Sequence, residues 1–333
     1  MKKVYKLNNT IFRILYFLKL VEVLKKFIKM LLASKQILFT EVTYYPPIVL
    51  KFERNFARYI GKRHGLTFCN GTSSIEAALF AIGIDKGDEV IVPSCTFHAS
   101  IDPILNLGAV PVFVDIDTVS GSVLISDLTD KISRNTKCII VVHLFGNVAN
   151  IDSISALAKS KGIMVVEDVS HAHGALYEGK KVGSFGDISC FSLQGAKAIS
   201  AGEGGIALTD DERLFSLMSM YGHFSRHKHL FKAEDMKYQY TGIGHKLRAN
   251  PLGIGMASID LMFNDFYNNK ARKNKKFFET MFKSVEGITV MASSQNGQSG
   301  GFFGGLPVLI DPMRYSIDKI IGTLSSYGIN VNR

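Results

Sequence analysis

Short apolar runs alternate with helix-like patterns along the middle of the chain, from about residue 49 to residue 209. Several runs are continuous rather than alternating, as in the valine and isoleucine stretch that begins at Cys138. Continuous runs indicate strands buried on both faces, which is typical of a mainly parallel sheet covered by helices. The pattern therefore predicts an α/β fold. The expected strands are Leu66–Cys69, Glu89–Pro93, Val110–Asp115, Cys138–Leu144, Ile163–Asp168, Ile188–Leu193 and Gly205–Thr209.

Apolar positions at helical spacing predict helices around and between these strands. These helices are Val49–Ile60, Thr72–Ile82, Ala99–Leu107, Ile151–Ser160 and Glu212–Tyr221. After about residue 245 the pattern changes, which indicates a smaller second domain. It contains a long helix, Pro251–Phe282, a Gly/Ser-rich loop, Ser293–Gly305, a strand, Leu306–Ile310, and a helix, Ser316–Tyr327. We therefore expect a large domain over residues 46–245 and a small domain over 246–333.

Residues 1–45 form a separate leader that carries most of the net charge of +10. Residues 1–35 hold nine basic residues and one acid, whereas the rest holds 30 basic and 28 acidic residues. Polar residues three or four positions apart predict an amphipathic helix over residues 11–32. Charged residues interrupt it too often for a transmembrane helix or a signal peptide. It either packs on protein, lies peripherally on an anionic membrane surface or is poorly ordered.

Composition excludes several classes of protein. The chain is 47% hydrophobic and 20% charged, so its body is not disordered. A nucleic-acid binder usually carries its basic residues on the folded body, and this body is nearly neutral, so we expect no nucleic-acid partner. The four cysteines contain no Cys-x-x-Cys pair, which favours a reducing compartment and hence a cytoplasmic protein.

Polar residues follow the first expected strand at the place where ligands bind in open α/β sheets. Asn70, Gly71, Thr72 and two serines lie between this strand and the next helix. A glycine with small hydroxyl residues at a helix N-terminus suits a phosphate group, because free N–H groups and the positive end of the helix dipole meet there. The same residues also suit a simple helix cap.

A pair of carboxylates, Glu167 and Asp168, ends the fifth expected strand. A buried carboxylate needs a cationic or N–H partner. One interpretation is a local ion pair. Another is a metal site that includes His171 and His173, although residues two apart ligate together only on extended backbone. We predict no metal.

Lys197 lies in a loop between the sixth and seventh expected strands. A lysine near desolvating walls has a lowered pKa and can react with an aldehyde, although a loop lysine is usually only solvated. The sequence has no G-x-G-x-x-G after a strand and no G-x-x-x-x-G-K-[ST]. A phosphate seat, a carboxylate and a lysine at three strand ends instead suit pyridoxal phosphate, with its phosphate on the helix, its ring nitrogen on the carboxylate and its aldehyde on the lysine.

Eight motifs follow one another in order over about 200 residues, from Phe52 to Pro251. They are FERNFARYIG, NGTSSIEAAL, GDEVIVPSCTF, GAVPVFVDID, VVHLFGN, VEDVSHAHGA, GSFGDISCFSLQGAK and GEGG. Together they resemble the DegT/DnrJ/EryC1/StrS family of sugar aminotransferases, which depend on pyridoxal phosphate and belong to the aspartate-aminotransferase superfamily. The resemblance implies the three-layer fold type I of that superfamily, with a mainly parallel seven-stranded sheet.

The resemblance also implies roles for single residues. Lys197 matches the lysine that binds the cofactor covalently, and Asp168 matches the aspartate that keeps the pyridine nitrogen protonated. His171 matches the position near the ring oxygen, and Phe97 matches the aromatic residue that stacks on the ring. The matches to the family's phosphate contacts are Gly71, Thr72 and Ser192.

Family members form homodimers in which each subunit completes the partner's site, and here the matching segment is 244–248. Lys246 stands where many members have asparagine, and Arg248 is a candidate for substrate contact. The chain ends at Arg333, where members usually continue through a further part of the small domain. We therefore expect a shortened small domain.

The implied activity is transfer of an amino group from glutamate or glutamine to a keto-sugar carried on a nucleotide, or to a cyclic ketone, in amino-sugar biosynthesis. One alternative is a catalytically impaired relative that binds the cofactor or serves as a scaffold. Another is a sugar dehydratase on the same fold. Members with dehydratase chemistry tend to lack the lysine, and Lys197 is present.

Overall fold

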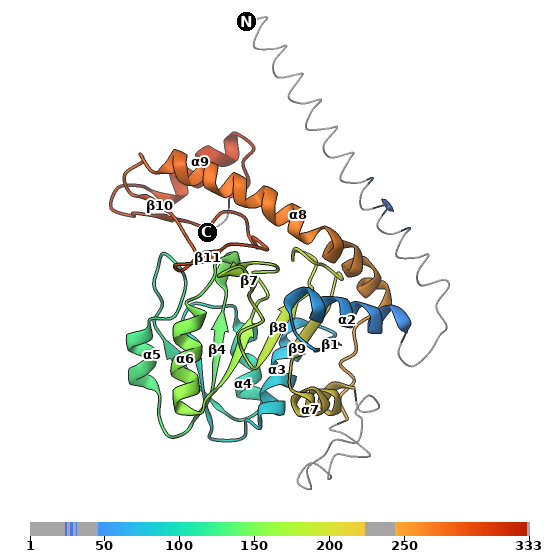
Figure 1. The fold of residues 1–333 in the computed structure, drawn as a ribbon. Helices are drawn as coiled ribbons and strands as arrows, with labels where there is room; N and C mark the ends of the chain where they lie inside the picture. The colour runs from blue at the N-terminus through green and yellow to red at the C-terminus, as the bar shows by residue number, and fades with distance from the viewer. Residues whose placement is uncertain (1–23, 25–26, 29–30, 32–45, 224–243, 332–333) are drawn as a thin grey trace, which may run out of the picture.

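A seven-stranded sheet forms the centre of the computed structural model, which describes residues 24, 27, 28, 31, 46–223 and 244–331. The strand order is β1-β9-β8-β5-β4-β2-β3 (Figure 1). Strand β9 runs antiparallel to both neighbours, and the other adjacent pairs are parallel. The predicted mainly parallel sheet is thus confirmed. Its strands are β1 (His64–Phe68), β2 (Glu89–Pro93), β3 (Val110–Val114), β4 (Thr136–Val142), β5 (Met164–Asp168), β8 (Ile188–Ser192) and β9 (Gly205–Thr209).

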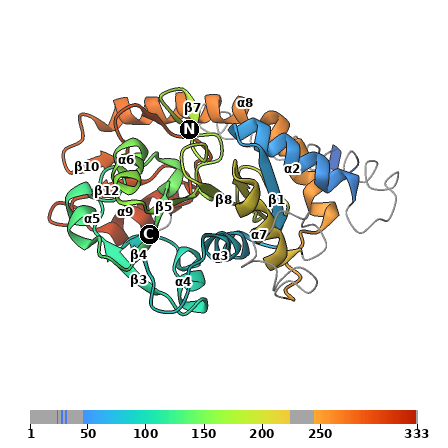
Figure 2. The same ribbon diagram turned by 60° about the horizontal axis from the view of Figure 1, so that its bottom comes forward.

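Helices cover both faces of this sheet and make the three layers (Figure 2). One face carries α3 (Gly71–Ile82), α4 (Asp102–Asn106) and α7 (Glu212–Gly222). The other face carries α2 (Pro47–Ile60), α5 (Ile125–Lys131), α6 (Ile151–Lys161) and the start of α8 (Pro251–Phe282).

Two apolar cores lie on opposite sides of the sheet, and single strands contribute to both. In β5, Val165 belongs to the core under α2 and α6, whereas Val166 belongs to the core under α3 and α7. Successive side chains of a strand point to opposite faces, so a strand buried on both faces must be apolar at consecutive positions. This explains the continuous valine and isoleucine runs of the sequence.

The expected helices are present, with two differences in detail. The segment predicted as Ala99–Leu107 is divided into a short 3-10 turn, η1 (His98–Ser100), and the helix α4. Pro103 near the start of α4 explains the break, because proline removes a backbone donor and restricts the residue before it. Helix α5 was not among the sequence predictions.

The region after α8 folds around two small sheets. Strands β10 (Ile288–Val290) and β12 (Val308–Ile310) pair antiparallel, and α9 (Ile317–Ser326) follows them. The expected loop over Ser293–Gly305 contains a short strand, β11 (Gly297–Gln298), so the prediction of a plain loop was wrong. Strand β11 pairs with β6 (Leu176–Tyr177), which pairs with β7 (Lys180–Lys181). These pairings connect the C-terminal region directly to the segment that follows β5.

The predicted leader helix lies almost entirely outside the described residues. Leu24, Phe27, Ile28 and Leu31 are described, and their side chains are exposed. Within the described part of the chain, no helix has both the length and the apolar character that crossing a membrane requires.

Candidate active site

The first turn of α3 forms a cradle of backbone N–H groups beside β8. The side chain of Asn70 accepts a hydrogen bond from the Ser73 N–H at 2.8 Å. The N–H groups of Gly71 and Thr72 also lie in this turn and have no carbonyl within the helix to bond. A Cβ on Gly71 would lie 2.9 Å from the Cβ of Ser192, so glycine is what allows the helix to approach β8 so closely. The cradle has the donors and the positive helix end that an anion requires.

The Asp168 carboxylate lies at the end of β5 and is 6% exposed. The Ser100 hydroxyl donates to its Oδ2 at 2.8 Å, and the Ser170 N–H donates to its Oδ1 at 3.0 Å. The Ser170 hydroxyl in turn accepts a hydrogen bond from the Ser192 N–H at 3.1 Å. A continuous set of contacts therefore joins the carboxylate to the cradle.

The neighbouring Glu167 points the other way and has a structural partner set. Its Oε2 lies 3.1 Å from His143 Nε2, and its two oxygens accept three N–H bonds from the segment 183–186. Burial acts most strongly against its charge, yet His143 and these N–H groups together hold the pKa of Glu167 below its ordinary value. Glu167 thus has local structural partners, whereas Asp168 is bound by serines.

Lys197 follows β8 and faces an aromatic ring. Its Nζ lies 3.5 Å from the centre of the Phe303 ring. Burial lowers the pKa of Lys197 to about 8, although the nearby Asp168 acts in the opposite direction. At that pKa about one tenth of the lysine is a free amine at pH 7, compared with less than about one thousandth for an ordinary lysine. Lys197 is thus suited to attack an aldehyde or to accept a proton.

Two histidines lie next to Lys197, and both accept backbone hydrogen bonds. His171 Nδ1 accepts from the Phe145 N–H at 3.3 Å, and its ring stacks on Phe303 with centroids 4.2 Å apart. Burial, helped by the charge of Lys197, lowers the pKa of His171 to about 4. A neutral imidazole that stacks on a ring is suited to face a flat cofactor.

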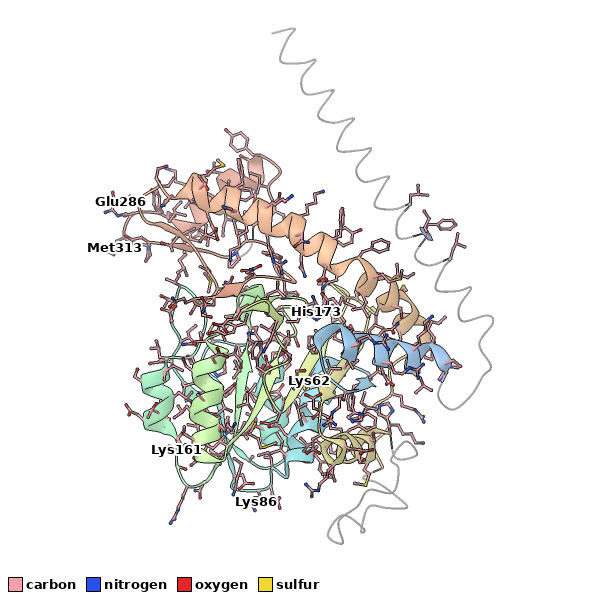
Figure 3. The ribbon with its side chains drawn as sticks, viewed as in Figure 1. Lys62, Lys86, Lys161, His173, Glu286 and Met313 are labelled. Carbon is pink, nitrogen blue, oxygen red and sulfur yellow. The ribbon has the colours of Figure 1, made fainter. Side chains whose placement is uncertain are left out.

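His173 is completely enclosed between α8 and the sheet (Figure 3). Its Nδ1 accepts from the Ile199 N–H at 3.2 Å, which holds the loop that carries Lys197. Burial first, and then Lys197, lower its pKa to about 3. Since backbone N–H groups already bond to Nδ1 of both His171 and His173, these nitrogens are occupied. Across the described ranges, no group of three or more His, Cys, Asp or Glu side chains is arranged to hold a metal ion.

The structure does not bring every predicted residue to this site. The Phe97 side chain is 60% exposed, and its ring lies against His98 with centroids 4.0 Å apart. Lys246 and Arg248 are exposed on either side of Leu247, whose carbonyl accepts the Cys69 N–H at 2.7 Å. The segment that carries them is therefore close to the cradle, and the roles expected for these three residues stay predictions.

Ser100, Ser170 and Phe303 were missed by sequence reasoning. Phe303 belongs to the Gly/Ser-rich segment 293–305. The glycines of this segment were the only feature of the sequence that could have indicated its close packing on the site. A Cβ on Gly300 would lie 2.5 Å from the Ala175 backbone nitrogen, and one on Gly301 would lie 2.6 Å from the His171 carbonyl oxygen. These glycines let the segment pack backbone to backbone on the site.

Replacing Gly71 by alanine is expected to disrupt the cradle. The new Cβ would meet the Cβ and Cα of Ser192 at 2.9 and 3.1 Å, so the helix start has to move. We expect a loss of about 1–3 kcal/mol in the free energy of unfolding and a smaller stabilisation by added phosphate or pyridoxal phosphate. Thermal unfolding with and without each ligand measures both effects. Gly322→Ala in α9, where the new Cβ meets nothing within 4 Å, is the control and should not destabilise the protein. Equal ligand effects in the two variants would contradict the assignment of the cradle.

Comparison with known proteins gives a consistent set of relatives. The profile of the DegT/DnrJ/EryC1/StrS aminotransferase family matches residues 30–332. GDP-perosamine synthase of Escherichia coli O157:H7 is 40% identical over 224 residues, which are 67% of this chain and 60% of that protein. L-glutamine:2-deoxy-scyllo-inosose aminotransferase of Streptoalloteichus tenebrarius is 41% identical over 164 residues, which are 49% of this chain and 39% of that protein.

Solved structures show the same fold. The X-ray structure of an aminotransferase from Psychrobacter cryohalolentis is 28% identical, with a TM-score of 0.78 over 90% of this chain and 80% of that one. The structural neighbours have fold type I, as the sequence predicts. The chain spans 60%, 44% and 56% of three GDP-perosamine synthases that it matches, which is less than two thirds of each.

Proposed function

We propose that this chain, which belongs to the DegT/DnrJ/EryC1/StrS aminotransferase family, is a pyridoxal-phosphate-dependent aminotransferase. The observation that carries the proposal is the convergence of three groups at three strand ends. These are the N–H cradle at Gly71, the Asp168 carboxylate and the Lys197 amine, whose pKa is lowered to about 8. An anion seat, a carboxylate and a reactive amine are the groups that this cofactor needs.

The residues of the site fit the cofactor. Gly71, Thr72 and Ser192 would hold its phosphate, and Asp168 would face its ring nitrogen. His171 would lie beside the ring, and Lys197 would bind the aldehyde. When bound, pyridoxal phosphate supplies an aldehyde that links to amines and a ring that withdraws electrons. The close approach of Gly71 to Ser192 supports this arrangement, since it brings the helix start beside the end of β8.

Lys197 would move the proton during the reaction. Its amine would remove the proton from the α-carbon of the amino donor and return a proton to the acceptor carbon. A base with a pKa of about 8 is well matched to this work at neutral pH. Asp168 is held in place by Ser100 and Ser170 and would keep a proton on the ring nitrogen.

The substrates are proposed from the names of the relatives. GDP-perosamine synthase suggests a keto-sugar carried on a nucleotide as the acceptor, and the scyllo-inosose enzyme suggests a cyclic ketone with glutamine as donor. We therefore propose glutamate or glutamine as the amino donor. We propose that the reaction belongs to amino-sugar biosynthesis.

We further propose a homodimer in the cytoplasm. Exposed Lys246 and Arg248 flank a segment next to the cradle, which supports a contact of this segment with a partner's site. All four cysteines are unpaired, which supports a reducing compartment.

A visible absorption spectrum of the purified protein with pyridoxal phosphate tests the proposal. We expect a band from the cofactor bound to Lys197, and we expect glutamate or glutamine to remove it. A band that ignores both donors would favour a relative that binds the cofactor without using these donors. Absence of any band would contradict the proposal.

A further inference from the structure

The Phe303 ring contacts both the Lys197 amine and the His171 imidazole. Lys197 Nζ is 3.5 Å from the ring centre. The His171 ring is stacked on Phe303, with centroids 4.2 Å apart and planes inclined by 20°. Phe303 therefore contacts two predicted site residues although it comes from the far end of the chain.

Hydrogen bonds to α8 and to the carbonyl of Gly146 hold the segment that carries this ring. Asn268 of α8 accepts the Gly301 N–H at 2.8 Å, and Arg272 of α8 donates to the Ser299 carbonyl at 2.7 Å. The Gly300 N–H donates to the Gly146 carbonyl at 3.0 Å. The close backbone contacts of Gly300 and Gly301 add to these bonds. The bonds to α8 and to Gly146 thus fix the backbone that carries the Phe303 ring.

We propose that Phe303 is a positioning residue that holds the Lys197 amine in place for the aminotransferase reaction and keeps water from one side of it. This inference rests on the proposed function for the use of the amine, but the contact itself does not depend on it. Lysine has a flexible stem of four carbons, so the amine needs a partner to stay in one place.

An aromatic face is well suited to this task. It attracts the charged form of the amine through the electrons of the ring. It accepts no full proton and forms no ion pair, so the amine can still lose its proton. A carboxylate in the same place would hold the lysine in its charged form. The ring thus fixes the amine and reduces its reactivity less than a carboxylate would.

The other groups that face Lys197 are Asp168 from β5 and two histidines from the loop after it. Asp168 favours the charged lysine. His171 and His173 have pKa values lowered to about 4 and 3, so both are neutral between pH 6 and 10. In this range their charge does not change and does not obscure the titration of Lys197.

Competitive acetylation of the cofactor-free full chain tests the proposal. Acetic anhydride labels free amines, and peptide mass spectrometry reports the labelling of Lys197 between pH 6 and 10. In the wild type, half-titration should come near pH 8. Phe303→Ala admits water and should shift the curve to higher pH, so that labelling at pH 8 falls about three- to tenfold. Phe303→Leu keeps apolar cover without the ring face and should shift the curve to lower pH. Phe303→Tyr keeps the ring and should match the wild type.

The opposite shifts of the alanine and leucine variants distinguish positioning from simple loosening of the site, which would move both to higher pH. Phe302→Leu is the matched control and should leave the curve unchanged. The proposal is wrong if the alanine and leucine variants of Phe303 both titrate like the wild type, if both shift upward or if Phe302→Leu shifts as far. If the alanine variant does not fold, the leucine and tyrosine variants decide.

The loaded enzyme provides a second readout. We expect Phe303→Leu to lower kcat and to leave the KM of the donor nearly unchanged, because the ring acts on the lysine rather than on donor binding. A wild type that gives the expected labelling but no visible band with pyridoxal phosphate would overturn the proposed function and leave the contact of Phe303 with Lys197 intact.

Discussion

Replacing Lys197 by alanine should abolish transamination and leave the fold intact. The change removes both the amine that binds the cofactor and the base that moves the proton, so kcat should fall by about 10⁴-fold or more. Stability should change little, because the lost contact of Nζ is with the face of Phe303. Removal of a partly buried charge also offsets the lost packing.

Turnover with glutamate or glutamine and thermal unfolding measure these two effects. Lys161→Ala is a suitable control, because Lys161 is exposed at the end of α6, far from the site (Figure 3). Near-normal turnover in the Lys197 variant would exclude the proposed mechanism. Loss of the fold would show instead that Lys197 is structural.

Replacing Asp168 by asparagine should be the second most damaging change. The amide has the same shape, and its oxygen can still accept the Ser170 N–H while its NH₂ group faces the Ser100 hydroxyl. The negative charge that holds a proton on the ring nitrogen is lost, so kcat should fall by about 10²-fold or more. The free energy of unfolding should change by less than about 1 kcal/mol, since both hydrogen bonds can be kept.

Glu167→Gln is the matched control on the adjacent residue. It should lower the free energy of unfolding strongly and kcat only slightly. Its carboxylate bonds to His143 and three N–H groups, so loss of the charge should cost about 3 kcal/mol of stability. The lowered pKa of Glu167 means that its charge stabilises the fold above its ordinary pKa and that this contribution disappears as the pH falls. Steady-state kinetics and unfolding curves at several pH values separate the two variants. Equal loss of activity and stability in both would contradict the division of roles between Asp168 and Glu167.

The sheet was predictable because burial on both faces leaves a direct mark on composition. Val165 and Val166 are adjacent and enter different cores, which only a covered strand allows. The antiparallel direction of β9 was not predicted, because an apolar run does not indicate whether a strand runs parallel or antiparallel to its neighbours. The connection from β8 to β9 contains no helix, and parallel neighbours need a long crossover, so this connection was the available signal for an antiparallel pair.

The positions of Asp168, Lys197 and Gly71 followed from the rule that ligands bind at strand ends. The contacts of Phe303 did not, because they join segments far apart in the sequence and depend on the close approach permitted by Gly300 and Gly301. The exposure of Phe97 was equally invisible to sequence reasoning, since an aromatic residue in a loop has no periodic neighbours that report burial.

The adjacency of Glu167 and Asp168 makes β5 intolerant of small insertions and deletions. Residue Asp168 is aligned with Val142 of β4 and Cys190 of β8. Slippage of β5 by one residue would turn each of the two carboxylates to the opposite face of the sheet. A shift that brings Glu167 to the position of Asp168 would put Val166 opposite the N–H groups of 183–186, which would then lose their carboxylate. Insertion or deletion of one residue in the turn after α6 would therefore damage folding and chemistry together.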